Sequence, residues 1–337
     1  MVDLFTWAAS ALALAGTGFV LLLTLRRLVL ARQERERLEA EDRLRPLALA
    51  LLEGETPEVA GLEPRDLHVL TALLARYARW VRGHARDHVA GFFESRGEVE
   101  RELAHLRNRR AWRRATAAFA LGDMGSAAAV PALLETLDDH DRDVRGAAAR
   151  SLGRLGAVAA VQPLAIALGT GSIPRAVAGQ ALLTIGPAAL DGLELLLGHE
   201  EAEVRACAVE LIGLLGDASD ASLLAARLRD TSAEVRAKAS RALGRLGAED
   251  AAAELRATLA DRIPFVRTAA ATALGAIGDR EAVPDLLGQA AWDEFYPARA
   301  AAHAVARVDP AAAAAAAEAE NAPHVCEAVD LLEVRRT

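Results

Sequence analysis

The sequence predicts an all-α fold, a solenoid of paired antiparallel helices preceded by one N-terminal transmembrane helix. Three observations predict this class. Residues 4–25 contain no charged side chain, an arginine recurs every 30 or 31 residues from position 114 onward, and a glycine ends most of the alanine-rich stretches that follow these arginines. A steady period of this size is typical of stacked helical repeats, in which each unit buries its apolar face against its neighbours.

The composition of the 337 residues excludes several classes of protein. Hydrophobic residues make up 53 % of the chain and aromatic residues 4 %, which excludes a disordered or collagen-like chain. The two cysteines, Cys207 and Cys326, are too few for a disulfide framework and lack the spacing of a zinc site, so a reducing compartment fits best. The net charge is −8, and residues 116–337 are strongly acidic, which argues against a nucleic-acid partner.

Residues 1–30 are interpreted as an N-terminal membrane anchor. The uncharged run LFTWAASALALAGTGFVLLLTL at 4–25 is long enough, at about 1.5 Å per residue, to cross a bilayer as a helix. No cation precedes the run, whereas arginines follow it at 26, 27, 32, 35 and 37, so we expect an uncleaved anchor with the N-terminus outside. The chain is therefore expected to be a single-pass protein of a bacterial inner (plasma) membrane, with its solenoid in the cytoplasm.

Two segments connect this anchor to the repeats. Residues 31–45 alternate acids and arginines, which predicts a charged, solvated juxtamembrane helix with ion pairs four residues apart, and Pro46 is expected to end it. Residues 26–115 carry 19 arginines against 15 Asp and Glu, and this basic character next to the membrane predicts contact of the juxtamembrane segment with anionic lipid. Residues 46–111 are expected to form a helical N-terminal cap or degenerate repeats.

The repeats themselves occupy residues 112–308. Four segments nearly superimpose: DVRGAAARSLGRLG at 143–156, EVRACAVELIGLLG at 203–216, EVRAKASRALGRLG at 234–247 and FVRTAAATALGAIG at 265–278. Each predicts a first helix that ends at a glycine in the left-handed conformation, at Gly156, Gly216, Gly247 and Gly278. A second helix follows after a short turn, with Pro131 or Pro284 in its first turn.

The recurring arginine is interpreted as a structural ladder. Its positions are Arg114, Arg145, Arg175, Arg205, Arg236 and Arg267. An aspartate stands six residues before several of these arginines, at Asp139, Asp230 and Asp261, and Asp293 with Arg299 continues the pattern. We expect ion pairs and helix caps, with guanidinium groups bridging adjacent loops. Catalysis is not expected here, because an active site rarely occurs six times in one chain.

These units resemble HEAT repeats of the short bacterial type found in phycobilisome (PBS) lyase-like proteins, through the Val-Arg pair, the alanines, Ala-Leu-Gly-x-Leu-Gly and Pro-x-Leu. The resemblance covers residues 112–308 and implies a curved surface that holds other proteins. Residues 309–337 are expected to form an alanine-rich segment and a C-terminal capping helix.

The sequence suggests an interaction scaffold and contains no convergent set of catalytic, cofactor-binding or metal-binding residues. His84 and His88, for example, lack a third ligand. We expect a membrane-associated protein partner, such as another inner-membrane complex, on a concave surface formed by the second helices. The alternatives are bilin-lyase-type chemistry, ligand binding, or a role as accessory subunit of a membrane glycosyltransferase. The candidate partner-binding residues are Glu135, Thr136, Ile166, Arg227, Thr258, Asp285 and Gln289.

Overall fold

A computed structural model describes the backbone of residues 2–55, 57, 59, 61–81, 83–319 and 323–334. Within its helices, the side chains of residues 2–18, 20–21, 323 and 330–334 lie outside the described part. Every regular element in the described ranges is helical. The chain divides into two units, Met1–Ala104 with Asp123–Ser126, and His105–Gly122 with Ala127–Thr337.

Unit 1 is built on one long helix, α1 (Val2–Leu52). It also contains α2 (Pro64–Ala78), α3 (His84–Ser95) and nearly all of α4 (Glu98–His105). The last turns of α1 pack against α2 and α3 and bury Ala40, Leu44 and Ala48.

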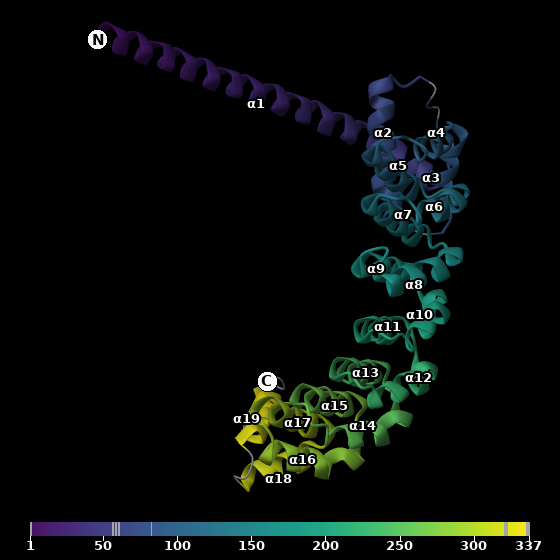
Figure 1. The fold of residues 1–337 in the computed structure, drawn as a ribbon, viewed down its shortest axis with the longest axis vertical. Coiled ribbons are helices and arrows are strands. Elements are labelled where there is room, and N and C mark those ends of the chain that lie inside the picture. The colour runs from purple at the N-terminus through teal and green to yellow at the C-terminus, as the bar shows by residue number, and fades with distance from the viewer. Residues whose placement is uncertain are drawn as a thin grey trace. The chain divides into compact units, whose positions relative to one another are not determined.

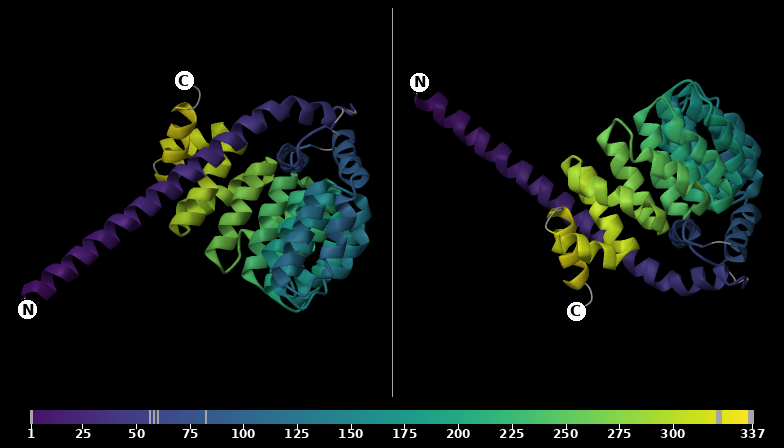
Figure 2. Two further views of the ribbon diagram at one scale, coloured as in Figure 1. Left: turned by 90° about the horizontal axis from the view of Figure 1, so that it is seen from above. Right: turned by 90° about the horizontal axis from the view of Figure 1, so that it is seen from below.

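The expectation that Pro46 ends a helix was wrong, because Pro46 lies inside α1. A proline removes one hydrogen bond and can bend a helix without ending it when packing holds both sides. Figure 2 shows α1 bending over its C-terminal part.

Ion pairs in residues 31–45 partly match the expectation for this segment. Arg32 pairs with Glu36 at 2.9 Å, four residues apart on α1. The segment is not fully solvated, however, because Glu41 is buried and accepts from Arg76 of α2 at 2.8 Å.

The predicted membrane span at residues 4–25 lies mostly among positions whose side chains are outside the described part. In the part of the chain that the structure describes, no helix is both long enough and apolar enough to cross a membrane.

Unit 2 is a stack of helix pairs in two layers (Figure 1). The first helices of the pairs form one layer: α5 (Ala111–Met124), α7 (Arg142–Leu155), α9 (Arg175–Ile185), α11 (Ala202–Leu215), α13 (Ala233–Leu246), α15 (Pro264–Ile277) and α17 (Phe295–Val308). The second helices form the other layer: α6 (Val130–Thr136), α8 (Val161–Thr170), α10 (Leu190–Leu196), α12 (Ala221–Ala225), α14 (Ala252–Thr258) and α16 (Val283–Trp292).

Short 3-10 turns connect the two layers and precede the second helices. They are η1 (Ala127–Ala129), η2 (Val158–Ala160), η3 (Pro187–Ala189), η4 (Ala218–Asp220), η6 (Glu249–Ala251) and η7 (Arg280–Ala282), while η5 (Ala226–Arg229) extends α12. The stack ends with α18 (Pro310–Glu318) and α19 (Pro323–Val334), which pack against α17 and each other.

Close glycine–alanine contacts bring the first helices together. A Cβ added to Gly244 of α13 would lie 2.6 Å from the Cα of Ala273 on α15, and one added to Gly275 would lie 2.8 Å from the Cβ of Ala304 on α17. Small residues at a helix contact shorten the distance between helix axes. From α7 to α17 the unit bends toward this layer, which is therefore the concave one (Figure 1). We call it the inner layer, and the layer of second helices the outer layer.

The glycines expected at the ends of the first helices behave in two ways. Gly156, Gly247 and Gly278 adopt the left-handed conformation, with φ of 64°, 64° and 87°. Gly216 does not, since its φ is −79° and its ψ −179°. The following Asp217–Asp220 capping box ends α11 differently, because the Asp220 carboxylate accepts from the N–H of Asp217 at 3.0 Å.

Candidate functional site

The regular spacing of the arginines produces bidentate ion pairs between neighbouring repeats. Arg205 at the start of α11 donates from Nε and Nη2 to the two carboxylate oxygens of Asp230, at 2.8 and 2.7 Å. Arg236 reaches Asp261 in the same way, at 2.7 and 3.0 Å. Arg114 with Asp139 and Arg267 with Asp293 complete the set. Each arginine therefore pairs with an aspartate 25 or 26 residues ahead, in the next loop.

This pairing corrects the expected one. The carboxylate six residues before Arg145, Arg236 and Arg267 belongs to an arginine earlier in the chain, and only its backbone carbonyl accepts from the nearer arginine. Arg236 Nη1 donates to the carbonyl of Asp230 at 2.9 Å, and Arg267 Nη1 donates to that of Asp261 at 2.8 Å. One aspartate thus joins two arginines from successive repeats, and the guanidinium groups bridge adjacent loops.

The same aspartates also hold the residue that precedes each following helix. The Oδ1 atom of Asp230 accepts from the N–H of Ser232 at 2.8 Å, and Oδ1 of Asp261 accepts from that of Ile263 at 2.9 Å. Burial by itself raises the pKa of these carboxyls. The arginine and backbone hydrogen bonds outweigh burial, so the pKa of each lies below its ordinary value. The guanidinium groups donate to the paired carboxylates and to backbone carbonyls of the adjoining loop, which suits a structural role.

The ladder is interrupted at two repeats. Arg145 donates to the backbone oxygen of Ser172 at 2.9 Å instead of to an aspartate. Arg175 pairs with the more exposed Glu201 and Glu203. His199 takes the place of the aspartate here: its carbonyl accepts from Arg205 at 2.8 Å and its Nδ1 lies 3.1 Å from the N–H of Glu201. This part of the stack has weaker connections between neighbouring repeats.

Arg299 does not continue the ladder. Gly275 of α15 faces Ala304 of α17, just as Gly244 faces Ala273, and this register puts Ala298 at the ladder position. Arg299 is therefore displaced by one residue and pairs with Glu327 of α19 at 3.0 Å.

The seven candidate partner-binding residues lie in the outer layer and not on the concave surface, so this expectation was wrong. Thr136 and Thr258 are buried and donate to backbone oxygens of their own helices. Arg227 donates to the carbonyl of Leu197 at 3.0 Å, and Gln289 to that of Leu259 at 3.3 Å. These four side chains stabilise the stack.

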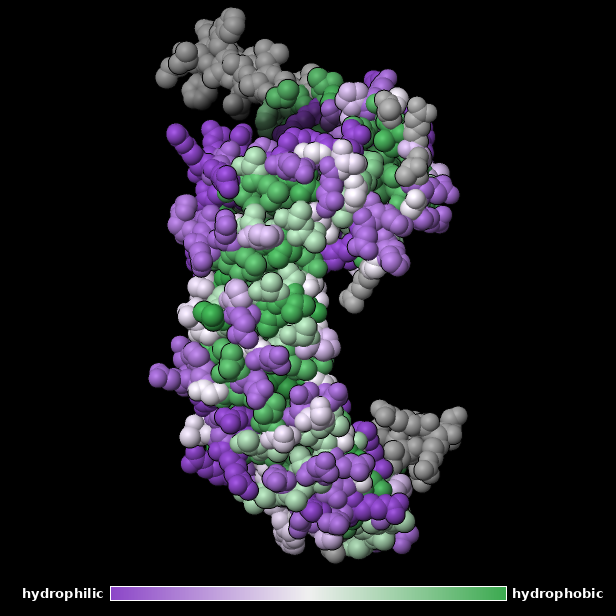
Figure 3. Space-filling view, turned by 90° about the vertical axis from the view of Figure 1, so that its right-hand side faces the viewer, coloured by the Kyte–Doolittle hydropathy of each residue, from purple (hydrophilic) through white to green (hydrophobic). Residues whose placement is uncertain are grey.

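The remaining three candidates, Glu135, Ile166 and Asp285, are exposed. Ile166 is 63 % exposed. Val158 before it and Leu195 after it in the sequence are also exposed apolar residues. Figure 3 looks onto the outer layer and shows apolar residues gathered over its middle.

The inner layer presents a different set of exposed side chains, at fixed distances from the ladder position. Five residues after it stand Phe119, Arg150, Gln180, Glu210, Arg241, Thr272 and His303, all exposed or half-buried. Two residues before it, Phe265 and Tyr296 are 46 % and 75 % exposed. The 31-residue period contains this signal, but only knowledge of the direction of bending assigns these rows to the concave surface.

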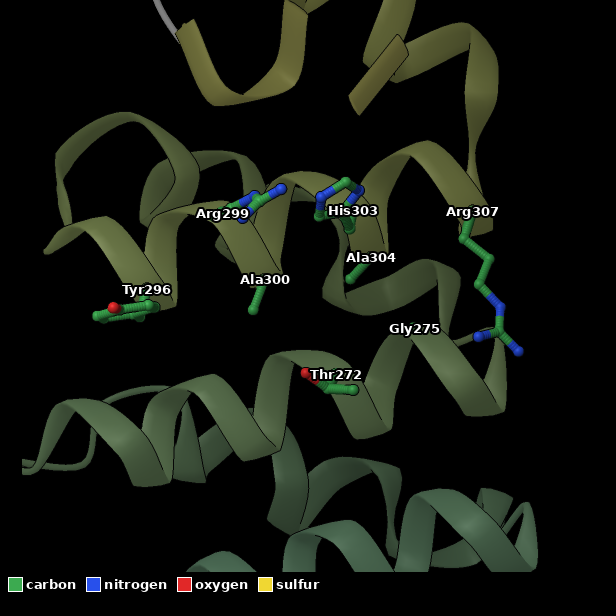
Figure 4. A pocket seen from close by; sticks show the side chains of 8 residues that line it. All are labelled: Thr272, Gly275, Tyr296, Arg299, Ala300, His303, Ala304 and Arg307. Carbon is green, nitrogen blue, oxygen red and sulfur yellow. The ribbon is translucent and has the colours of Figure 1, made fainter. Parts of the chain in front are cut away.

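A cavity of about 370 Å³ opens on the inner layer between α15 and α17. Its lining residues are Thr272, Gly275, Tyr296, Arg299, Ala300, His303, Ala304 and Arg307. Figure 4 shows Tyr296 and Arg307 at its two ends, with Arg299 and His303 between them along α17.

Metal and thiol chemistry find no support among the described residues. No group of three His, Cys, Asp or Glu side chains there could hold a metal ion. The Nδ1 atom of His88 lies 3.1 Å from the backbone oxygen of Leu52, and Nδ1 of His84 lies 3.9 Å from the Asp87 carboxylate. Cys207 and Cys326 are free, and burial raises the pKa of the Cys207 thiol.

The two-layer stack of helix pairs, joined by a repeated ion-pair ladder, defines a helical-repeat protein. A family model described as HEAT repeats matches residues 101–183 and 221–307, half of the chain, and the protein therefore belongs to the HEAT-repeat family.

Solved structures with a similar arrangement include human deoxyhypusine hydroxylase, with 22 % identity and a TM-score of 0.33 over 81 % of this chain and 98 % of that one. The CpcE–CpcF complex of phycocyanin lyase from a Nostoc species shows 24 % identity and a TM-score of 0.34 over 70 % and 94 % of the two chains. A chain of the Kap95p–RanGDP complex shows 14 % identity and a TM-score of 0.45 over 76 % of this chain and 42 % of that one. No curated protein matched the sequence. At these identities the likenesses concern the fold alone.

Proposed function

We propose that this protein is a non-enzymatic HEAT-repeat scaffold, anchored in a bacterial inner membrane by its N-terminal helix, that binds a membrane-associated protein partner on its concave inner layer. The observation that carries the proposal is the inner layer itself. It exposes periodic rows of charged, polar and aromatic side chains, such as Arg150, Glu210 and Arg241, on rigid packed helices. A wide surface of this kind suits a protein partner better than a small substrate.

The described part of α1 supports the anchor. Leu22, Leu23, Leu25, Leu28 and Leu30 are each 45–68 % exposed, and at about 100° per residue they are spread over about 220° of the helix circumference. Leucines exposed over so wide a face are stabilised when an apolar environment surrounds the helix. The arginines that follow residue 25 favour a cytoplasmic solenoid, and confinement to the membrane plane raises the effective concentration of the scaffold toward partners in the same membrane.

The proposal is tested by affinity capture of the tagged full-length protein from mild-detergent membranes, followed by mass spectrometry. The inner-layer variant Arg150→Glu/Arg241→Glu should lose a partner that the wild type recovers in stoichiometric amount. The matched outer-layer variant Arg229→Glu/Arg280→Glu changes the charge equally at exposed positions and should retain it. Equal recovery by both variants would reject the concave surface as the binding site.

The anchor is tested separately by deleting residues 1–30 and following the protein through membrane fractionation. We expect the full-length chain to resist carbonate extraction and the deleted chain to be recovered in the supernatant. A deleted chain that stays with the membrane pellet would refute the N-terminal anchor.

A further inference from the structure

The cavity between α15 and α17 has a row of basic side chains along one edge. Arg299, His303 and Arg307 stand four residues apart on α17, so they share one face of the helix. Arg307 is exposed and Arg299 half-buried. In a chain of net charge −8, the two arginines of this row place two positive charges on the concave inner layer.

The rest of the lining provides space and one further hydrogen-bond donor. Gly275, Ala300 and Ala304 have small or no side chains and leave the cavity of about 370 Å³ open. The hydroxyl groups of Thr272 and Tyr296 stand at its margin (Figure 4). The Thr272 hydroxyl donates to the backbone oxygen of Thr268 at 2.8 Å, so the additional donor for a ligand is the Tyr296 hydroxyl. Guanidinium groups donate hydrogen bonds and never accept them, so the cavity suits a ligand with several anionic acceptors.

The spacing of the basic row indicates the form of that ligand. Four residues along an α-helix rise by about 6 Å. Alternate side chains of an extended peptide point to the same side and lie about 6.6–6.8 Å apart. We propose that this cavity binds an extended acidic peptide segment of a protein partner, running along α17 with carboxylates at alternate positions. This inference rests on the proposed scaffold function and specifies the chemistry of one partner.

The structure already contains a carboxylate at one end of the row. Glu327 of α19 accepts from Arg299 at 3.0 Å, and the two side chains are 45 % and 43 % exposed. An exposed pair of this kind contributes little energy, so a peptide carboxylate can join or replace it. The nearby acids Asp293 and Glu294 are directed instead at Arg267.

Aromatic side chains extend the site beyond Arg299, at the same end of the row as Glu327. Tyr296 and Phe265 are largely exposed at equivalent positions of successive repeats. Exposed aromatic residues beside a charged row are typical anchors for an apolar side chain of a bound peptide. We therefore expect the preferred peptide to carry an apolar residue at the end that lies over Tyr296.

The test uses the purified full chain in detergent and a fluorescein-labelled peptide, Leu-Ser-Glu-Ser-Glu-Ser-Glu, followed by fluorescence anisotropy. We expect saturable binding that weakens with added salt. Arg307→Glu should lower the affinity at least tenfold, and Arg307→Ala should lower it less. Arg280→Glu, an exposed outer-layer position on η7, makes the same charge change and should leave affinity within twofold. Circular dichroism melts would verify that each variant is folded.

Three outcomes would overturn the inference: equal binding by Arg307→Glu and Arg280→Glu, equal binding of a peptide with glutamine in place of glutamate, or Arg307-dependent binding of inorganic phosphate without binding of the peptide. These results leave the scaffold proposal standing if the full-length protein still captures its partner through the inner layer. The scaffold proposal is tested by loss of capture in Arg150→Glu/Arg241→Glu, a variant that leaves Arg307 unchanged, so the two proposals can fail separately.

Discussion

Replacing Asp230 by alanine removes the acceptor at one rung of the ladder. The substitution leaves the Arg205 guanidinium without its carboxylate and the N–H of Ser232 without its acceptor. The side chains of Arg205 and Asp230 are 11 % and 5 % exposed, so water has little access to the guanidinium once its carboxylate is removed. The expected effect is therefore that of breaking a buried pair by removing one partner.

The magnitude follows from these contacts. Removing one partner of a buried pair destabilises a protein by about 3–5 kcal/mol, and the lost hydrogen bond to the Ser232 N–H adds about 1 kcal/mol. Because the guanidinium still donates to the carbonyl oxygens of His199 and Glu200, we take the lower end and expect a loss of about 3 kcal/mol in the free energy of unfolding. Asp230→Asn keeps one oxygen acceptor and should cost about half as much.

The assay is urea unfolding of the full chain followed by circular dichroism. The matched control is Glu210→Ala, which breaks the Lys238–Glu210 pair between the same two helices, α11 and α13. That pair is 23 % and 51 % exposed, so its loss should cost at most about 0.5 kcal/mol. If Asp230→Ala and Glu210→Ala lower the unfolding midpoint equally, the ladder is not a buried structural element and the reasoning fails.

Further predictions follow from the helix contacts and the ladder. Gly244→Ala places a Cβ 2.6 Å from the Cα of Ala273 and should destabilise the stack by about 1–3 kcal/mol. Gly288→Ala, whose Cβ would have nothing within 4 Å, should stabilise the stack by up to about 1 kcal/mol. Equal melting temperatures for the two variants would contradict this prediction. His199→Asp should place a carboxylate opposite Arg175 and raise the melting temperature by a few degrees. An unchanged or lower melting temperature would show that His199 does not stand at an interrupted position of the ladder. Because the pKa of each ladder aspartate is lowered on folding, their stabilisation is fully present above the unfolded pKa of about 3.9 and is lost as the pH falls through the folded value. The urea midpoint should therefore fall steeply below about pH 4, and less steeply in Asp230→Asn; the same slope in both proteins would be inconsistent with this account.

The sequence alone is sufficient to predict the helical repeat. The 30- or 31-residue period, the small residues of the first helices and the glycines at their ends all act within one repeat, where spacing along a helix determines which face a residue occupies. The positions of the ladder arginines and aspartates could be found in the same way. At Gly216 the local prediction failed, because Asp217 and Asp220 provide a competing cap.

Only the tertiary structure decided which groups meet across repeats. Asp230 stands six residues before Arg236 yet gives its carboxylate to Arg205, since stacking brings the next loop against the start of the preceding helix. The direction of bending is likewise a property of the whole stack. Glycine–alanine contacts such as Gly244 with Ala273 shorten the inner layer, and the sum of these short contacts places the rows of α5 to α17, and not the outer helices, on the concave surface.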